Sequence, residues 1–156
     1  MFRICVCVLI FFLACNLKSI GTNNKKVNQD PLIIMQRTAC YGTCPQYDIS
    51  IYANGLIRYN GKAFVDRLSC FQAVLNSSII IDITLYLESI NFFQLDTAYI
   101  SAITDIPSVI TEVNFNNKTH KVVDRLNGPK ELKKIYSLID SVYASVLKWE
   151  KCKNLN

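Results

Sequence analysis

A stretch of alternating residues followed by an Asn-Gly pair restricts how this chain can fold more than any other feature. From Gln46 to Ala53, the apolar residues Tyr47, Ile49 and Ile51 alternate with more polar ones. A period of two residues is typical of a β-strand with one buried face. Asn54-Gly55 follows, and Asn-Gly favours a two-residue hairpin turn because both turn residues adopt positive φ angles. The sequence therefore predicts an antiparallel hairpin.

A second Asn-Gly pair, Asn60-Gly61, lies only a few residues further on and predicts a second turn. The two turns together predict a three-stranded meander, with strands at Gln46–Ala53, Leu56–Tyr59 and Lys62–Asp66. Two-residue turns fix which residues lie opposite one another, so they also fix which side chains share a face. One face, the expected core face, then carries Tyr47, Ile49, Ile51, Ala53, Leu56, Arg58, Ala63 and Val65.

The opposite face of this meander would carry an aromatic and apolar patch among polar residues. The patch consists of Tyr52, Ile57, Tyr59 and Phe64. If solvent reaches it, a contiguous apolar patch of this kind marks a candidate binding surface. The alternative is that a loop or a neighbouring element covers the patch.

The other predicted strands are Leu32–Ala39 and a second hairpin. Val109–Phe115 and Lys118–Asp124 form this hairpin around Asn116-Asn117, because asparagine tolerates the left-handed conformation that a tight turn requires. The segment between 95 and 108 is expected to be a loop. The sheet is therefore expected to contain an antiparallel meander and a second hairpin.

Two helices are predicted from apolar residues at steps of three and four. The first covers Ile80 to Phe93, although Ile79-Ile80-Ile81 locally favours a strand. The second follows Pro129, which suits the first turn of a helix, and continues to Trp149. The predicted fold class is α+β, with the meander and second hairpin in one sheet and the two helices packed on one face.

The N-terminal segment is typical of an export signal. Arg3 precedes an apolar run from Ile4 to Ala14, about half the length that a membrane-spanning helix needs. The end of the run, up to Cys15, resembles the bacterial lipobox. This resemblance implies diacylglyceryl transfer to the Cys15 sulfur, cleavage before that residue and acylation of the new amine. The alternatives are an ordinary secretory signal cut nearby, with Cys15 a bystander, and a retained anchor.

The predicted domain organisation follows from this segment. Residues 1–14 are a lipoprotein-type signal peptide, 15–30 are a flexible Asn- and Lys-rich tether, and 31–150 are a single domain. Asn16 is not the aspartate that usually holds lipoproteins at the inner membrane. By resemblance, we therefore expect a bacterial envelope protein anchored by lipid to the outer membrane, on its periplasmic or surface face.

The seven cysteines become interpretable once this segment is set aside. The two cysteines within the signal peptide would be removed with it, and Cys15 would carry lipid. Cys40, Cys44, Cys70 and Cys152 then remain. An even number suits an oxidising compartment, and three pairings are possible. Cys40 with Cys44 is favoured because glycine between them allows a tight turn; the Cys70–Cys152 pairing would then depend on geometry.

Other chemistry has weak support in the sequence. A redox pair prefers CxxC at the start of a helix, whereas this is CxxxC before a strand, and a zinc site needs four ligands where His120 is the sole histidine. Asp96, Asp105, Glu112 and Asp124 are scattered, so no catalytic pair is indicated. The net charge of +5 is mild and forms no basic stripe, which disfavours nucleic acid as a partner. No cofactor or metal is expected.

One block of residues resembles a known family. It runs from Arg37 to Tyr47 (RTACYGTCPQY) and is followed by Ile51-Tyr52, Gly55 and Tyr59-Asn60-Gly61. The C-[FY]-G-x-C-P-x-Y pattern, with Phe92-Phe93, Asp105-Ile106-Pro107 and Trp149 downstream, resembles the bacterial family known as domain of unknown function 6438. The resemblance covers roughly Leu32 to Trp149. It implies frequent export or lipidation and brings no known activity.

The function expected from the sequence is accordingly non-enzymatic. We expect an envelope protein that attaches to the membrane through its N-terminal lipid and binds an unknown envelope protein or small ligand, or serves a structural role. The alternative is an envelope thiol-redox protein or enzyme that uses Cys40 and Cys44.

Overall fold

The regular structure of the described residues consists of β-strands, two α-helices and one short 3-10 helix. This is a computed structural model, which describes residues 30–153. The strands are β1 (Ile33–Arg37), β2 (Gln46–Ile51), β3 (Leu56–Ala63), β4 (Ser69–Val74), β5 (Ala98–Tyr99), β6 (Val109–Phe115), β7 (Lys118–Asp124) and β8 (Glu150–Lys151). The helices are α1 (Ser77–Ser89), α2 (Lys130–Ser145) and the short 3-10 helix η1 (Phe92–Gln94).

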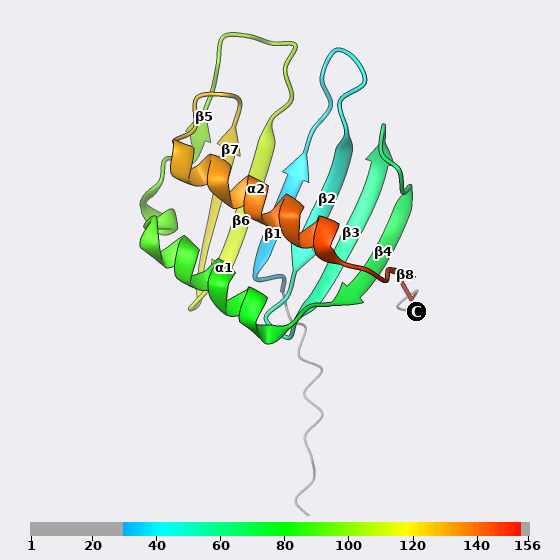
Figure 1. Cartoon of the computed structure of the whole chain (residues 1–156). Coiled ribbons are helices and arrows are strands. Elements are labelled where there is room, and N and C mark those ends of the chain that lie inside the picture. Colours follow the sequence, from blue (N-terminus) through cyan, green and yellow to red (C-terminus); the bar gives the residue numbers. More distant parts are fainter. Residues whose placement is uncertain (1–29, 154–156) are drawn as a thin grey trace, which may run out of the picture.

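All of these strands belong to one open sheet. Its order is β5-β7-β6-β1-β2-β3-β4-β8, and α1 and α2 lie over the same face (Figure 1). Only the β5–β7 pair is parallel among the described strands; the other neighbours are antiparallel. The predicted α+β fold, with one sheet and two helices on one face, is confirmed. The short parallel strand β5, within the predicted loop, makes the sheet mixed.

Several elements coincide with the sequence pattern. β6 and β7 have the predicted bounds, and Asn116 and Asn117 adopt the positive φ angles of 51° and 59° that their turn requires. α1 begins three residues earlier than predicted, because the Asn76 side chain accepts a hydrogen bond from the Ser78 N–H and caps the helix. Alternation and capping chemistry thus account for the outer part of the sheet and for α1.

The core lies between the sheet and the two helices. On the sheet side it is built from alternate residues of the central strands, which face the helices because successive strand residues point to opposite faces. On the helix side it is built from apolar stripes such as Leu132, Ile135 and Ile139 of α2. The other face of the sheet carries more polar side chains, including the Lys62–Asp48 ion pair.

The first Asn-Gly turn differs from the prediction by one residue. Ile51 lies opposite Ile57, and the Tyr52 N–H donates to the Leu56 carbonyl at 2.8 Å. The loop therefore contains three residues, with Gly55 at φ +87°, rather than the predicted two. A one-residue change in register moves every side chain of the second strand to the other face.

The second Asn-Gly pair is not a turn, and this prediction was wrong. Asn60 and Gly61 continue β3, which pairs with β2 on one side and β4 on the other. Gly61 is needed for another reason: a Cβ atom there would collide with the Arg67 carbonyl oxygen. The chain reverses after β3, between 64 and 68, so the predicted strand Lys62–Asp66 is also incorrect.

The predicted aromatic patch does not exist as one surface. Ile57 and Tyr59 lie in the core, 0% and 2% exposed, because the three-residue loop turns them toward the helices. Tyr52 is half-buried on the opposite face, where Arg58 lies over its ring, and Phe64 is exposed in the β3–β4 connection. The four residues are therefore divided among the core, the open face and a loop.

α2 crosses the sheet and contacts one strand after another (Figure 1). In its first half, the Tyr136 hydroxyl lies 3.4 Å from an Asp124 carboxylate oxygen of β7. In its middle, Asp140 is bonded to side chains of β1 and β2. Near its end, the Tyr143 ring stacks on Tyr59 of β3, with ring centroids 4.5 Å apart. These contacts fix the direction of the helix across the strands.

The four cysteines of the domain form two disulfides. Cys40 is bonded to Cys44 within the β1–β2 connection, and Cys70 of β4 is bonded to Cys152 after β8. The second bridge holds the C-terminal segment against the sheet, where the Cys152 N–H also donates to the Cys70 carbonyl at 3.0 Å. β4 is thereby covered along part of its outer edge.

The predictions for the N-terminal segment are not tested by this fold. The signal peptide (1–14), Cys15 and the tether up to residue 29 lie outside the described residues. Between residues 30 and 153, no helix has the length and apolar character needed to cross a bilayer.

The two disulfides are expected to differ in their effect on stability. In the chain-entropy model, a bridge that closes a longer loop restricts the unfolded chain more, which gives about 4.5 kcal/mol for Cys70–Cys152 and about 2 kcal/mol for Cys40–Cys44. Urea unfolding of the Cys70→Ser/Cys152→Ser and Cys40→Ser/Cys44→Ser double variants measures both values. An equal or larger loss in the Cys40/Cys44 variant would contradict this expectation.

Candidate functional site

A pocket lies at the end of the sheet where β1 ends and β2 begins. Its volume is about 320 Å³, and it is bordered by the β1–β2 connection, the segment before β6 and the middle of α2. We call it the Arg37 pocket. Its lining residues are Arg37, Cys44, Pro45, Tyr47, Pro107, Ser108, Val109 and Asp140.

Three polar side chains are connected along the wall of this pocket. The Arg37 guanidinium donates to the Tyr47 hydroxyl at 2.7 Å and to an Asp140 carboxylate oxygen at 2.5 Å. The Tyr47 hydroxyl in turn donates to the other Asp140 oxygen at 2.6 Å. Alternation along β1 and β2 turns Arg37 and Tyr47 toward the helices, where Asp140 meets them. The three residues form a closed ring of hydrogen bonds.

The surroundings shift the proton affinities of this ring. Burial lowers the pKa of Arg37, but its hydrogen bond to Asp140 and the charge of that carboxylate outweigh burial and raise the pKa overall. Burial also raises the pKa of Tyr47, as does its hydrogen bond to Asp140, while the positive charge of Arg37 opposes the shift. Tyr47 therefore remains a neutral hydrogen-bond donor, and Arg37 remains a cation, throughout the physiological range.

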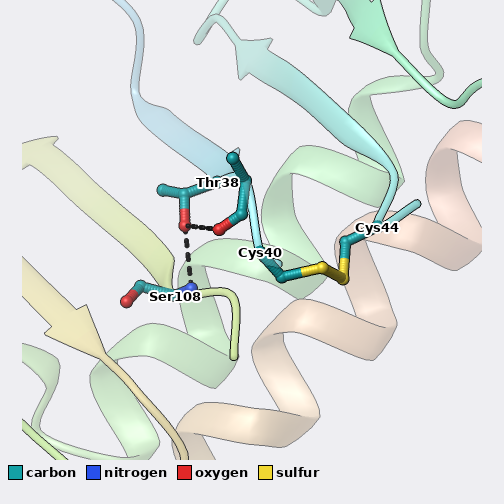
Figure 2. Close-up of a disulfide and its surroundings, with 5 residues drawn as sticks. Thr38, Cys40, Cys44 and Ser108 are labelled. Carbon is teal, nitrogen blue, oxygen red and sulfur yellow. Dashed lines mark hydrogen bonds between the residues drawn. A yellow bond between two sulfur atoms is a disulfide. The ribbon is translucent and has the colours of Figure 1, made fainter. Parts of the chain in front are cut away.

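The Cys40–Cys44 disulfide and a pair of loops form the rim of the pocket. Figure 2 shows the disulfide beside Thr38, whose hydroxyl accepts a hydrogen bond from the Ser108 N–H at 2.8 Å. The Thr38 N–H donates to the Ser108 carbonyl, and the Tyr41 N–H donates to the Asp105 carbonyl. The disulfide thus closes the β1–β2 connection on itself, and the hydrogen bonds join this connection to the segment before β6.

Apolar side chains stand exposed on the same two loops. Tyr41, between the bridged cysteines, is 90% exposed, and Ile103 on the neighbouring loop is 52% exposed. Both project from loops whose backbones are held by the bonds just described. Loops that contact another molecule commonly have a backbone held in place and exposed apolar side chains.

The lining of the pocket offers both polar and apolar contacts. Arg37, Tyr47 and Asp140 offer hydrogen-bond donors, acceptors and charge, while the prolines, Val109 and the disulfide offer apolar contact. Within the described residues, no group of three or more His, Cys, Asp or Glu side chains is placed to hold a metal ion. The pocket therefore suits a small group that combines a polar end with an apolar body.

The residues singled out from the sequence lie in several different places. Cys44 borders the pocket and Cys40 supports its rim, whereas Cys70 and Cys152 lie at the far edge of the sheet. His120 of β7 packs against Phe92, and its ring nitrogen lies 2.9 Å from the Leu95 carbonyl, a structural contact. Neither Arg37 nor Asp140 is a site residue predicted from the sequence.

A second, larger hollow lies at the opposite end of the sheet. Its volume is about 540 Å³, and the β6–β7 turn forms much of its lining. Most of its lining side chains are exposed, and it lacks a connected ring of partly buried polar groups such as the one at Asp140. We therefore regard the Arg37 pocket as the better candidate site.

Alkaline pH is expected to destabilise the fold through tyrosine ionisation. Burial raises the pKa values of Tyr47, Tyr59 and Tyr136 above the ordinary value of 10.0. The unfolded chain therefore releases these protons at lower pH than the folded chain does, so their contribution to stability is complete below pH 10.0 and is lost as the pH rises further. Urea unfolding between pH 8 and about 12 measures this loss.

The Tyr47→Phe variant isolates the contribution of the pocket tyrosine to this loss of stability at alkaline pH. Removing its hydroxyl makes the loss of stability above pH 10.0 smaller. The two lost hydrogen bonds also lower stability at neutral pH by about 1 to 2 kcal/mol. The matched control Tyr41→Phe, at a side chain 90% exposed, leaves stability at neutral pH unchanged. An unchanged alkaline slope in Tyr47→Phe would show that this hydroxyl does not contribute.

Comparison with known proteins agrees with the motif around the disulfide. A family model described as domain of unknown function (DUF6438) matches residues 31–143, which include β1 to β7 and nearly all of α2. No curated protein matches the sequence. The matched region contains every residue that lines the Arg37 pocket. The match covers well over half of the chain, and the chain therefore belongs to the DUF6438 family.

Proposed function

We propose that this chain is an exported bacterial envelope protein, anchored through lipid on Cys15, whose domain binds a partner or small ligand in the Arg37 pocket. In this proposal the domain is not an enzyme. The anchor holds the protein at the membrane, on the periplasmic or surface face of the outer membrane. The pocket carries the proposal, because it combines an apolar lining with a half-buried ring of polar groups.

The disulfides support export. All four cysteines of residues 31–153 are paired, and one bridge joins segments 82 residues apart. Disulfides persist in oxidising compartments such as the bacterial periplasm and are rare in the reducing cytosol. Paired cysteines therefore agree with the export signal that the sequence predicts for residues 1–14.

The position of the pocket supports binding away from the membrane. β1 begins at Ile33, beside the start of the domain, and ends at Arg37, roughly 13 Å further along the strand. Figure 1 shows the β1–β2 and β5–β6 connections at the opposite end of the sheet from the start of β1. A lipid on Cys15 would tether the domain by its other end, so the pocket rim would be accessible to an envelope partner.

The half-buried state of the polar ring supports binding as well. The Arg37 and Asp140 side chains are 29% and 33% exposed, so water still reaches an ion pair that lies beside apolar lining. Ligand sites commonly consist of an apolar concavity with a few well-placed polar groups that fix orientation.

Thiol–disulfide exchange is the second candidate, because Cys44 borders the pocket. In that reaction, a thiolate of a partner dithiol attacks one sulfur and displaces the other as a thiolate. The second partner thiol then resolves the mixed disulfide, so the partner is oxidised and the Cys40–Cys44 bridge is reduced. Loss of function in Cys40→Ser/Cys44→Ser while the variant remains folded at the assay temperature would favour exchange over binding.

Lipid attachment is tested by metabolic labelling of the full chain in a bacterium. An alkyne-bearing fatty acid should label the wild-type protein and the Cys7→Ser variant but not Cys15→Ser, because only the Cys15 sulfur accepts the diacylglyceryl group. Label that persists in Cys15→Ser would place the lipid elsewhere. An unlabelled wild-type protein in the soluble fraction would indicate secretion without lipid.

Binding through the pocket is tested by filling it. Pro45 is exposed on the rim, so Pro45→Trp adds a large side chain there without removing a member of the polar ring. Cross-linking in intact envelopes should yield a specific adduct that falls at least about fivefold in Pro45→Trp, a loss of roughly 1 kcal/mol of binding. The matched control is Ser141→Trp, on the exposed side of α2. Equal adduct in both variants would exclude the pocket as the binding site.

A further inference from the structure

We propose that the Arg37 pocket recognises a carboxylate carried on an apolar group, as at the C-terminal residue of a polypeptide. This inference rests on the proposed binding function and names the chemical class of the ligand. Charge complementarity at Arg37 argues for the carboxylate, and the pocket lining argues for the apolar group.

Within the ring, Arg37 keeps more unused hydrogen-bonding groups than Tyr47 or Asp140 does. A guanidinium carries five N–H donors. Two of them are bonded, one to Tyr47 and one to Asp140. Each Asp140 oxygen already accepts a short bond, and the Tyr47 hydroxyl both accepts and donates. The strongest remaining interaction that the ring can make is therefore donation from Arg37 to a ligand oxygen.

A carboxylate is the group that best matches this capacity. A planar guanidinium binds carboxylate oxygens through parallel charge-assisted hydrogen bonds, which are about twice as strong as neutral ones. The ion pair with Asp140 offsets part of the charge of Arg37 but occupies only one of its N–H groups. A cationic ligand would instead meet Arg37 at close range and be repelled.

A second cation, Arg125, is hydrogen-bonded to a residue that lines the pocket. The Arg125 Nε–H donates to the hydroxyl of Ser108 at 3.3 Å, and Ser108 lines the pocket. Asp140 is the one carboxylate among the residues that line the Arg37 pocket. Among the lining residues and the side chains that are hydrogen-bonded to them, two cations therefore stand against one carboxylate, which favours an anionic ligand over a cationic one.

The apolar part of the ligand follows from the remaining lining. Pro45, Pro107, Val109 and the Cys44 side chain present mainly carbon and sulfur. A volume of about 320 Å³ is near the lower limit for ligand pockets, which suits one or two residues rather than a large molecule. The side chain and main-chain carboxylate of a C-terminal leucine or valine would supply both features in adjacent positions.

The experiment compares two acetylated tripeptides of sequence Gly-Gly-Leu that differ only in their last group. One ends in a free carboxylate and the other in an amide, and both are titrated into the full chain in detergent by NMR or calorimetry. The acid should bind about tenfold more tightly than the amide, as expected for one charge-assisted hydrogen bond pair. Arg37→Gln should abolish this difference, whereas Arg67→Gln, at an exposed arginine outside the pocket, should retain it.

If Arg37→Gln fails to fold, Pro45→Trp takes its place in the test. Pro45→Trp leaves the polar ring intact and should weaken binding of the acid. Isovalerate, a small branched acid, tests whether the carboxylate must belong to a polypeptide. If it binds as tightly as the peptide acid, the carboxylate class is supported and a small free acid suffices.

Two results would overturn the inference. Equal affinity for acid and amide, with both weakened by Pro45→Trp, would reject the carboxylate class and leave the binding function intact. Binding of neither peptide would also reject the class. The cross-linking comparison in envelopes would then decide separately whether the pocket binds any partner.

Discussion

The contact between Asp140 of α2 and the two strand residues Arg37 and Tyr47 determines much of this structure. α2 must cross several strands, and an apolar stripe alone would allow it to slide or rotate on the sheet. Hydrogen bonds are directional, so a carboxylate held at both oxygens fixes the position of the helix over β1 and β2. Tyr136 and Tyr143, about one turn away on either side, extend this anchoring to β7 and β3.

The same contact creates a surface that apolar packing would have closed. A salt bridge gains little net stability over well-packed apolar residues, because both charges must lose water. Here the cost is reduced because the ring lies at the end of the sheet, where water still reaches Arg37 and Asp140. The Cys40–Cys44 bridge and the Thr38–Ser108 bonds hold the backbones of the adjoining loops in place. A pocket therefore remains where α2, β1 and β2 meet.

Sequence patterns could predict the elements that depend on local physics. The bounds of β6 and β7 follow from alternation and from the Asn116-Asn117 turn. The apolar stripe predicts α2, although the helix ends at Ser145 and not at the predicted Trp149. The β3–β4 connection could not be predicted, because Phe64 within it and Ser69 at the start of β4 adopt positive φ angles without being Gly or Asn. Gly61 resembled a turn residue, but it is required by the nearby Arg67 carbonyl. Asp140 lies 93 residues from Tyr47, so only the tertiary fold could show their contact.

The one-residue difference at Gly55 also changes where function can be sought. A two-residue turn would have left Ile57 and Tyr59 on the open face, as an apolar patch for a partner. The three-residue loop turns them into the core instead, where Tyr59 stacks on Tyr143 and helps to hold α2. Tyr59, a candidate for an exposed binding patch if solvent had reached it, thus supports the helix that carries Asp140. The family block from Arg37 to Tyr47 contains two of the three residues of the polar ring, and Asp140 of α2 supplies the third.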